Sequence, residues 1–300
     1  MITLREFLRA PFLNCYKAYY RIRGPDDCVA VMDEEWDSLL ILDGCRYDMF
    51  VGACDYPGSL EKRRSCGSTT DEFVRSNLGS QRFEDVVYVS ANPRVSLNFE
   101  GSFHEIVRVW EDGWDEELRT VPPWTVTDAA RRAHEEFPNK RIVVHYIQPH
   151  APFIGEYARS NLPEHSTLAD HAPDQGGDGA ANNIWEHLAA GRVDRATVQC
   201  AYEENLDITL EYVEPLLDDL DGRIVVTSDH GNLVGERLPP FMKRMYGHPT
   251  RLYAPGLVEV PWFVVENGQR REVVAEEATE GDDIEVTEAT KAKLESLGYR

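Results

Sequence analysis

Five short apolar runs constrain the fold of this chain more than any other feature. They lie at 38–42, 86–90, 141–147, 223–228 and 260–265. Each is bounded by polar residues and predicts a buried strand of a parallel sheet. Between them, helical patterns lie at about 70–78, about 125–137 and about 194–220. Strands that alternate with helices predict an α/β fold with a doubly wound, mostly parallel sheet flanked by helices.

Acidic and histidine residues stand just after three of these runs and shortly before a fourth. They are Asp43, His150, the pair Asp229 and His230, and His248. Because ligands of open parallel sheets bind at the carboxyl ends of the strands, we expect these side chains to converge there. Carboxylate and imidazole groups that converge make a site for a divalent cation such as Zn²⁺ or Mn²⁺.

A segment rich in hydroxyl groups precedes the helix predicted at about 70–78. Residues 65–73 are Ser-Cys-Gly-Ser-Thr-Thr-Asp-Glu-Phe. A hydroxyl at a helix N-terminus meets free backbone N–H groups and the positive end of the helix dipole, which suit an anionic substrate. A nearby cation would lower the pKa of that hydroxyl and so make it a nucleophile. The same residue types are good N-caps, so the segment alone leaves capping and catalysis open.

Taken in chain order, these motifs resemble a known superfamily. They are Asp-Gly-x-Arg-x-Asp after the first run, Ser and Thr opening a helix, Tyr-x-Gln-Pro-His-x-Pro, Thr-Ser-Asp-His-Gly and Gly-His-Pro. Their order resembles the alkaline phosphatase superfamily, above all its sulfatase-like branch with lipoteichoic acid synthases and phosphoethanolamine transferases. The ending Leu-Glu-Ser-Leu-Gly-Tyr is similar to the end of many sulfatase-like chains, and the resemblance covers about 38–300.

The resemblance implies a metal centre. Asp43, Asp229, His230 and the nucleophile hydroxyl would hold one divalent cation, zinc or manganese first and calcium or magnesium as alternatives. Whether a second metal binds stays open.

The resemblance also implies catalytic residues. A sulfatase-like Gly-Ser-x-Thr alignment makes Thr70 the nucleophile, the lipoteichoic acid synthase pattern points to Thr69, and Ser68 is a third candidate. His150 and His248 would bind substrate oxygens, protonate the leaving group or hold the second metal.

Several residues depart from the family patterns. Sulfatases proper mature a cysteine within Cys-x-Pro-x-Arg, and Cys66 lies in another context. Asn232 stands where many relatives carry Glu after Asp-His-Gly, and Ile154 stands where alkaline phosphatases carry a second histidine. Arg46 could contact substrate, but we expect it to form an ion pair with Asp48.

Together these features predict a metal-dependent hydrolase or group transferase that acts on phosphate or sulfate esters through a threonine nucleophile. A threonine-type sulfatase and a catalytically inactive metal-binding protein of the same fold are the alternatives. The expected substrate is a small-molecule, lipid-linked or glycan ester.

The chain is strongly acidic, and this bears on its partners. It has 53 Asp and Glu against 31 Lys and Arg, for a formal net charge of −22. Only six of the basic residues are lysines. Salt screens such self-repulsion, so the composition favours a halophilic protein over an ordinary acidic one. Nucleic acid is not an expected partner, because a phosphate backbone needs basic patches.

The ends and the cysteines complete the predicted organisation. Residues 1–25 are basic and amphipathic, are interrupted at Pro11, and either pack on the domain or contact a membrane surface peripherally. Residues 26–300 form one catalytic domain with a surface insertion at about 158–183, which is either a lid or disordered. An acidic, loosely ordered connector is expected at 267–290, followed by a closing helix at 288–299.

The expected location of the protein is the cytoplasm. The first residues lack the apolar core of a signal peptide, and no apolar run is long enough to span a membrane. The six cysteines show no CxxC pair and are expected to be reduced and mostly buried.

Overall fold

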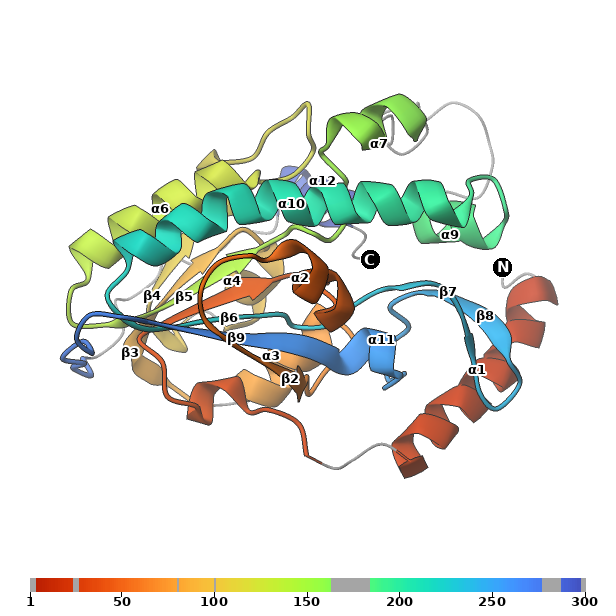
Figure 1. Cartoon of the computed structure of the whole chain (residues 1–300), viewed down its shortest axis with the longest axis horizontal. Helices are drawn as coiled ribbons and strands as arrows, with labels where there is room; N and C mark the ends of the chain where they lie inside the picture. Colours follow the sequence, from red (N-terminus) through yellow and green to blue (C-terminus); the bar gives the residue numbers. More distant parts are fainter. Residues whose placement is uncertain are drawn as a thin grey trace.

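A seven-stranded sheet forms the centre of the molecule (Figure 1). The computed structural model describes residues 4–23, 27–79, 81–99, 101–162, 184–276 and 287–297. The strand order is β2-β9-β6-β1-β5-β3-β4. In chain order the strands are β1 (Ser38–Leu42), β2 (Ser59–Arg64), β3 (Phe83–Ser90), β4 (Phe103–Arg108), β5 (Arg141–Tyr146), β6 (Gly222–Thr227) and β9 (Glu259–Asn267).

Five neighbouring strands of this sheet, from β6 to β4, run parallel. The strand β9 is antiparallel to β6, and the edge strand β2 is antiparallel to β9. The sheet is therefore mixed but mostly parallel, as predicted, whereas the parallel direction expected for the run at 260–265 is wrong. The reason lies in the segment before β9, which stays at the carboxyl edge of β6: the N–H of Gly231 donates to the carbonyl of Leu257 at 2.8 Å. No helix returns the chain to the opposite edge, so β9 has to run back across the sheet.

Helices cover both faces of the sheet (Figure 1). One face packs against α2 (Tyr47–Ala53), α5 (Val109–Asp112), α6 (Pro123–Glu136), α7 (Glu156–Asn161), α9 (Ile184–Ala189) and α10 (Arg195–Asp219). The other face packs against the short 3₁₀ helix Val31–Asp33, α3 (Thr70–Leu78) and α4 (Pro93–Phe99). The helices predicted at about 70–78, 125–137 and 194–220 correspond to α3, α6 and α10.

Alternation along the buried strands decides which side chains face α3. On β1, Leu40 and Leu42 lie in the core under α6 and α10, whereas Leu39 and Ile41 lie in the core under α3. Successive side chains of a strand point to opposite faces, so a residue at position 43 continues the α3 side. The fully buried central strands thus hold the residues that follow them in fixed positions.

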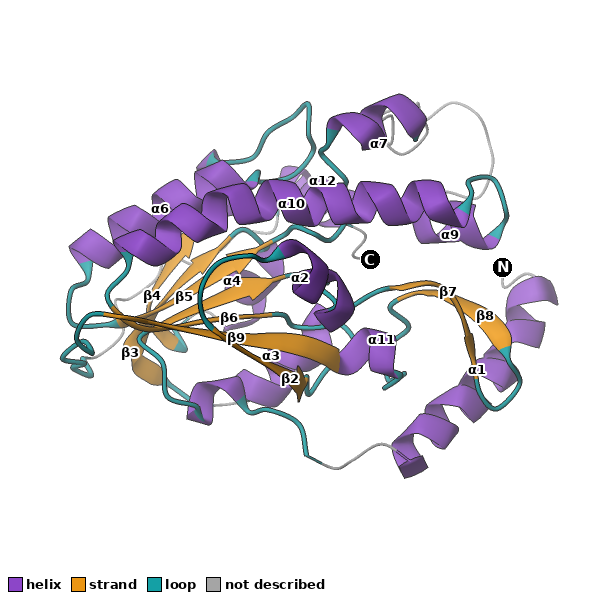
Figure 2. Ribbon diagram, in the orientation of Figure 1, coloured by secondary structure: helices purple, strands orange, loops and turns teal. Residues whose placement is uncertain are grey.

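A hairpin and the N-terminal helix lie beside the main sheet (Figure 2). The hairpin consists of β7 (Leu233–Leu238) and β8 (Lys243–Gly247), and it is followed by α11 (Pro255–Val258). The N-terminal helix is α1 (Leu4–Arg23), whose Tyr16 and Tyr20 are buried in one cluster with hairpin and α11 residues.

Of the two alternatives predicted for residues 1–25, packing on the domain or contact with a membrane surface, the structure shows packing on the domain for the described helix α1. The interruption expected at Pro11 is wrong, because α1 continues through that position although a proline there removes one backbone hydrogen bond. Within the described ranges, no helix is both long enough and apolar enough to cross a bilayer.

The cysteines differ from the expectation that all six are reduced and mostly buried. Cys28 and Cys66 form a disulfide, and of the four free cysteines only Cys45 is buried. Parallel pairing of Val29 with Ser65 brings the two chain segments together next to the disulfide. The sequence lacks any spacing motif for this pair because its partners lie 38 residues apart and meet only through the fold.

Three peripheral expectations are tested only in part. The predicted insertion at about 158–183 begins inside α7, and residues 163–183 lie outside the described residues. Residues 268–276 of the predicted acidic connector form no helix or strand, and 277–286 are outside the described part. The closing helix is α12 (Glu288–Ser296), which ends before the predicted residue 299.

Candidate metal centre

The candidate site lies at the carboxyl edge of three neighbouring central strands. In the sheet, β1 stands between β6 and β5, so the residues that follow these strands are close together. Asp43 follows β1, Asp229 and His230 follow β6, and His150 lies in the loop after β5. The strand order, which the sequence could not give, is what brings these distant stretches to one place.

Two carboxylates and one imidazole form the centre of the site. One ligand atom from each of Asp43, Asp229 and His230 lies within 4.8 Å of the others, and all three residues are buried. Nε2 of His230 is 3.5 Å from Oδ2 of Asp229 and 3.6 Å from Oδ1 of Asp43. Nδ1 of His230 lies 3.0 Å from the carbonyl of Gly231, so it carries the proton and Nε2 presents its lone pair to the carboxylates.

Of the three candidate nucleophiles, Thr70 is the one that adjoins the carboxylates. Its Oγ1 lies 3.4 Å from Oδ2 of Asp43 and 3.3 Å from Nε2 of His230. Thr69 is the N-cap of α3 and accepts a hydrogen bond from the N–H of Glu72 at 3.3 Å. The hydroxyl of Ser68 donates to Oε2 of Glu72 at 2.9 Å rather than to Asp43 or Asp229.

Backbone and side-chain donors hold Asp229 in its ionised form. Its Oδ1 accepts hydrogen bonds from the N–H of Gly44 at 3.0 Å and from that of His230 at 2.8 Å. Burial by itself raises the pKa of Asp229, but electrostatic attraction from His230 and His145, together with hydrogen bonds from the N–H of Gly44 and the side chain of Thr70, outweighs it and holds the pKa below its ordinary value. The cluster therefore presents buried negative charge, which a bound cation would neutralise.

Two further histidines, His150 and His248, face each other beside this cluster. Their Nε2 atoms are 3.1 Å apart, and the rings of His230 and His248 have centroids 4.7 Å apart. Burial lowers the pKa of His150 to about 4, and burial together with the neighbouring histidines lowers that of His248 as well. Both rings are thus neutral at neutral pH.

Asn205 of α10 fixes the loop that carries His150. Its side-chain amide donates to the carbonyls of Pro149 and His150, each at 3.1 Å, and its carbonyl oxygen accepts from the N–H of Ile154 at 3.0 Å. This buried amide therefore takes the place of secondary structure in a loop that has little of its own.

A buried histidine of β5, His145, escaped the sequence reasoning. Its Nδ1 lies 2.9 Å from the hydroxyl of Tyr88, and burial lowers its pKa to about 4. Its Nε2 is buried and has no hydrogen-bond partner among the residues that the structure describes. Strand alternation could have revealed it, because His145 lies two residues beyond Val143, which faces α3.

Asn232, which departs from the family patterns, and two residues of the Asp-Gly-x-Arg-x-Asp motif have structural roles. Arg46 forms the expected ion pair with Asp48 at 2.7 Å and a second with Glu236 at 2.6 Å. Asn232 donates to the hydroxyl of Tyr202 at 3.2 Å. Gly44 has a φ of +74°, and a Cβ there would lie 2.7 Å from Nδ2 of Asn232, so only glycine fits that turn.

The spacing of the polar atoms fits a single metal ion. Four ligands at tetrahedral positions about 2.0–2.2 Å from a zinc ion lie about 3.4 Å from one another. Thr70 Oγ1 lies 3.3 Å from His230 Nε2 and 3.4 Å from Oδ2 of Asp43, and His230 Nε2 lies 3.5 to 3.6 Å from one oxygen each of Asp229 and Asp43. The ligand atoms of the two carboxylates and the imidazole all lie within 4.8 Å of one another. Two carboxylates, one imidazole with its lone pair directed inward and one hydroxyl also form a suitable donor set for Zn²⁺ or Mn²⁺.

Comparison with solved structures agrees with this architecture. No protein-family model and no curated protein matches the sequence. The integral membrane lipooligosaccharide phosphoethanolamine transferase A from Neisseria meningitidis matches with a TM-score of 0.50 and 14% identity, over 87% of this chain and 55% of that one. The C-terminal periplasmic domain of EcEptC from Escherichia coli, in a complex with Zn, matches with a TM-score of 0.51 and 13% identity, over 77% of this chain and 72% of that one.

These neighbours define the fold. The chain shares its fold with these two solved structures, and the fold is the α/β fold that the sequence motifs predicted. It covers about half the length of the Neisseria protein, so its fold corresponds to only part of that protein.

Proposed function

We propose that this chain is a metal-dependent enzyme that cleaves or transfers a phosphate ester through Thr70. The observation that carries the proposal is the cluster in which the Thr70 hydroxyl lies within 3.4 Å of both a carboxylate and an imidazole that fit a cation. The zinc complex of the Escherichia coli domain, which shares the fold, supports zinc as the first candidate metal and manganese as the second.

The residues of the site divide the work. Asp43, Asp229, His230 and Thr70 would hold the cation, which when bound lowers the pKa of a hydroxyl beside it and stabilises negative charge on phosphate oxygens. Thr70 Oγ1 forms a bond to phosphorus as the bond to the ester oxygen breaks, and the alcohol leaves with a proton.

Release completes the cycle. Water, or a second alcohol in the case of transfer, then displaces phosphate from the threonine and restores its hydroxyl. The neutral ring of His248 would donate a hydrogen bond to a substrate oxygen or assist the leaving group, whereas His150, whose Nδ1 lies 2.7 Å from the carbonyl of Ala151 and so carries its proton, would accept a hydrogen bond through Nε2.

Phosphate esters are preferred to sulfate esters for one structural reason. Cys66, the cysteine nearest to Thr70 in the sequence, is joined to Cys28 and is not available for maturation to formylglycine. A lipid-linked or glycan acceptor is proposed because the Neisseria neighbour is named as a lipooligosaccharide phosphoethanolamine transferase.

The test compares two adjacent threonines. Thr70→Ala should lower turnover of an aryl phosphate ester in the presence of Zn²⁺ or Mn²⁺ by at least about a thousandfold, since a lost oxyanion-hole donor alone costs 10²–10³. Thr69→Ala, the matched control, should keep most of the activity, and Thr70→Ser should restore part of it. Asp229→Asn should lose metal binding and turnover together.

The alternatives have separate signatures. Faster turnover of an aryl sulfate than of the phosphate would make the chain a threonine-type sulfatase. Tight metal binding without turnover across ester substrates would make it an inactive metal-binding protein. Full activity of Thr70→Ala, or loss of activity only in Thr69→Ala, would remove Thr70 as the nucleophile.

A further inference from the structure

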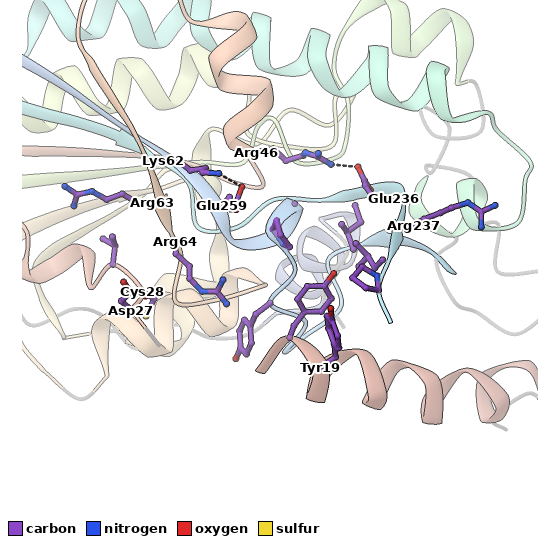
Figure 3. Close-up of a pocket in the computed structure, with 18 of the residues that line it drawn as sticks. Tyr19, Asp27, Cys28, Arg46, Lys62, Arg63, Arg64, Glu236, Arg237 and Glu259 are labelled. Atoms are coloured by element: carbon purple, nitrogen blue, oxygen red, sulfur yellow. Dashed lines mark hydrogen bonds and ion pairs between the residues drawn. The ribbon is translucent and has the colours of Figure 1, made fainter. Parts of the chain in front are cut away.

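A second feature of the molecule lies away from the metal centre. A cavity of about 1120 Å³ opens between α1, the edge strand β2, the hairpin strand β7 and the segment 253–259 (Figure 3). We call it the basic cavity. None of Asp43, Thr70, Asp229, His150, His230 and His248 lines it. Its volume is enough to enclose a ligand of drug size.

Five basic and four acidic side chains line this cavity, although the chain as a whole has far more acidic than basic residues. Lys62, Arg63 and Arg64 are successive residues of β2 and line the cavity with Arg46 and Arg237 (Figure 3). Most of them have acidic partners in the protein itself. Arg46 pairs with Asp48 and Glu236, Lys62 pairs with Glu259 at 3.0 Å, and Arg63 pairs with Glu34 at 2.9 Å.

Arg64 differs from its neighbours. Across the described residues, no hydrogen bond or ion pair reaches its guanidinium group, although Arg64 is half-buried and stands opposite Glu259 in the β2–β9 register. Glu259 forms its ion pair with Lys62 instead. Burial lowers the pKa of Arg64, against the opposing influence of Asp27, Glu259 and Tyr253, yet an arginine keeps its charge at all ordinary pH values. Among the described residues, two cations of the cavity, Arg64 and Arg237, therefore have no ion pair; the guanidinium of Arg237 donates to the carbonyl of Met242 at 3.1 Å, whereas that of Arg64 has no hydrogen-bond partner.

The wall formed by α1 and the hairpin has a different character. Apart from Glu236 and Arg237 of β7, it is aromatic and aliphatic, with Tyr19, Tyr20, Leu233, Leu238 and Pro239. An arginine fork on one side and an apolar wall on the other suit a molecule with an anionic head and an apolar chain.

We propose that the basic cavity binds an anionic amphiphile, with its head group on Arg64 and its alkyl chain against Tyr20 and Leu238. The site is independent of the metal centre. A thin wall separates the two: a Cβ on Gly231, the residue after His230, would lie 2.5 Å from the carbonyl oxygen of Gly256 and 2.8 Å from Cγ of Arg46. Because Arg46 and Gly256 line the cavity, the bound molecule would lie behind His230, away from the proposed chemistry.

The experiment uses dodecyl phosphate as the probe, below its micelle concentration, with the full-length chain free of metal. Isothermal titration should show one site, and Arg64→Gln should weaken binding at least tenfold. Arg64→Lys should retain most of the affinity. Arg82→Gln removes one positive charge from an exposed position outside the cavity and should bind as the wild type does. Circular dichroism verifies that each variant is folded.

Each arm can overturn the proposal. Absence of dodecyl phosphate binding, or equal binding by Arg64→Gln, would remove the site. Inorganic phosphate that binds as tightly as dodecyl phosphate would show that the alkyl chain has no place there. Dodecyl maltoside that binds as tightly would show that the charge on Arg64 is not used. None of these readouts depends on turnover, so the proposal fails or stands separately from the proposed enzyme activity.

Discussion

The candidate metal centre and the basic cavity are the two places where we propose that this acidic chain receives an anion, and they would obtain positive charge in opposite ways. The metal centre consists of buried carboxylates and imidazoles, and positive charge would come from a cation. In the basic cavity the charge belongs to the protein, above all to Arg64, because its neighbours Lys62 and Arg63 on β2 are paired with carboxylates. A chain with a net charge of −22 therefore can attract an anion only where a cation or an arginine outweighs the local carboxylates.

The two regions also differ in how they are supported. The metal centre stands on β6, β1 and β5, the central strands, whose side chains are buried on both faces. The basic cavity lies between an edge strand, the hairpin and α1. The Cys28–Cys66 disulfide lies at the boundary, since Cys28 lines the cavity and Cys66 stands four residues before Thr70. We therefore expect changes at the disulfide to affect the cavity more than the metal centre.

Removal of the disulfide should have the largest effect on stability. Closing a loop of 38 residues lowers the entropy of the unfolded chain by an amount worth about 4 kcal/mol at 25 °C in the chain-entropy model. The double variant Cys28→Ser, Cys66→Ser should lose about that much free energy of unfolding in guanidinium chloride. It should keep its affinity for Zn²⁺ and bind dodecyl phosphate more weakly.

Two measurements test this prediction. Cys15→Ser, which removes an exposed free cysteine, is the matched control and should unfold like the wild type. Alkylation of the denatured protein without reductant should modify four of the six cysteines, because two are joined. Modification of all six would show that the disulfide is absent.

Acid should affect the region of the metal centre through its buried histidines. The pKa of His145 is lowered from 6.5 to about 4 by burial, so the folded protein resists a proton that the unfolded chain accepts. Above pH 6.5 the residue is neutral in both states and its contribution is complete. As the pH falls from 6.5 to about 4, that contribution is lost, up to about 3 kcal/mol at about 1.4 kcal/mol per pKa unit.

The measurement is the free energy of unfolding of the metal-free chain between pH 8 and pH 4. This free energy should fall as the pH falls in the wild type. His145→Gln should reduce the slope by up to about the uptake of one proton on unfolding. The variant itself should be less stable than the wild type at pH 8. An identical slope in the variant and the wild type would contradict the assignment. Arg64 in the basic cavity carries its charge throughout this range, so the proposed anchor of the cavity does not titrate, whereas His145 beside the candidate metal centre does.

The features that could be predicted from the sequence are those that depend on residues close together in the chain. The buried runs that became β1, β5 and β6, and the polar residues after them, carry local signals of apolarity and spacing, and so the carboxyl-edge site could be placed. The edge strand β2 could not be predicted, because Ser59–Arg64 is polar and forms a strand through its pairing with β9. The direction of β9, the Cys28–Cys66 pair and the basic cavity depend on contacts between distant segments, which no local pattern records.

The sequence also could not decide between Thr69 and Thr70, because their roles depend on contacts with distant residues. The smallest of the predicted effects, a loss of stability in Thr69→Ala, distinguishes them. Both residues carry a hydroxyl group and stand at the start of a helix, so a sequence pattern cannot distinguish their roles. In the structure Thr69 accepts a hydrogen bond from the N–H of Glu72, so Thr69→Ala should lose an N-cap and about 1 kcal/mol of unfolding free energy. Zinc affinity should not change in that variant, whereas Thr70→Ala should lower it, because only Thr70 Oγ1 adjoins His230 and Asp43. If zinc affinity fell in Thr69→Ala and stayed unchanged in Thr70→Ala, the two assignments would be reversed. Thr69, rather than Thr70, would then belong to the metal centre.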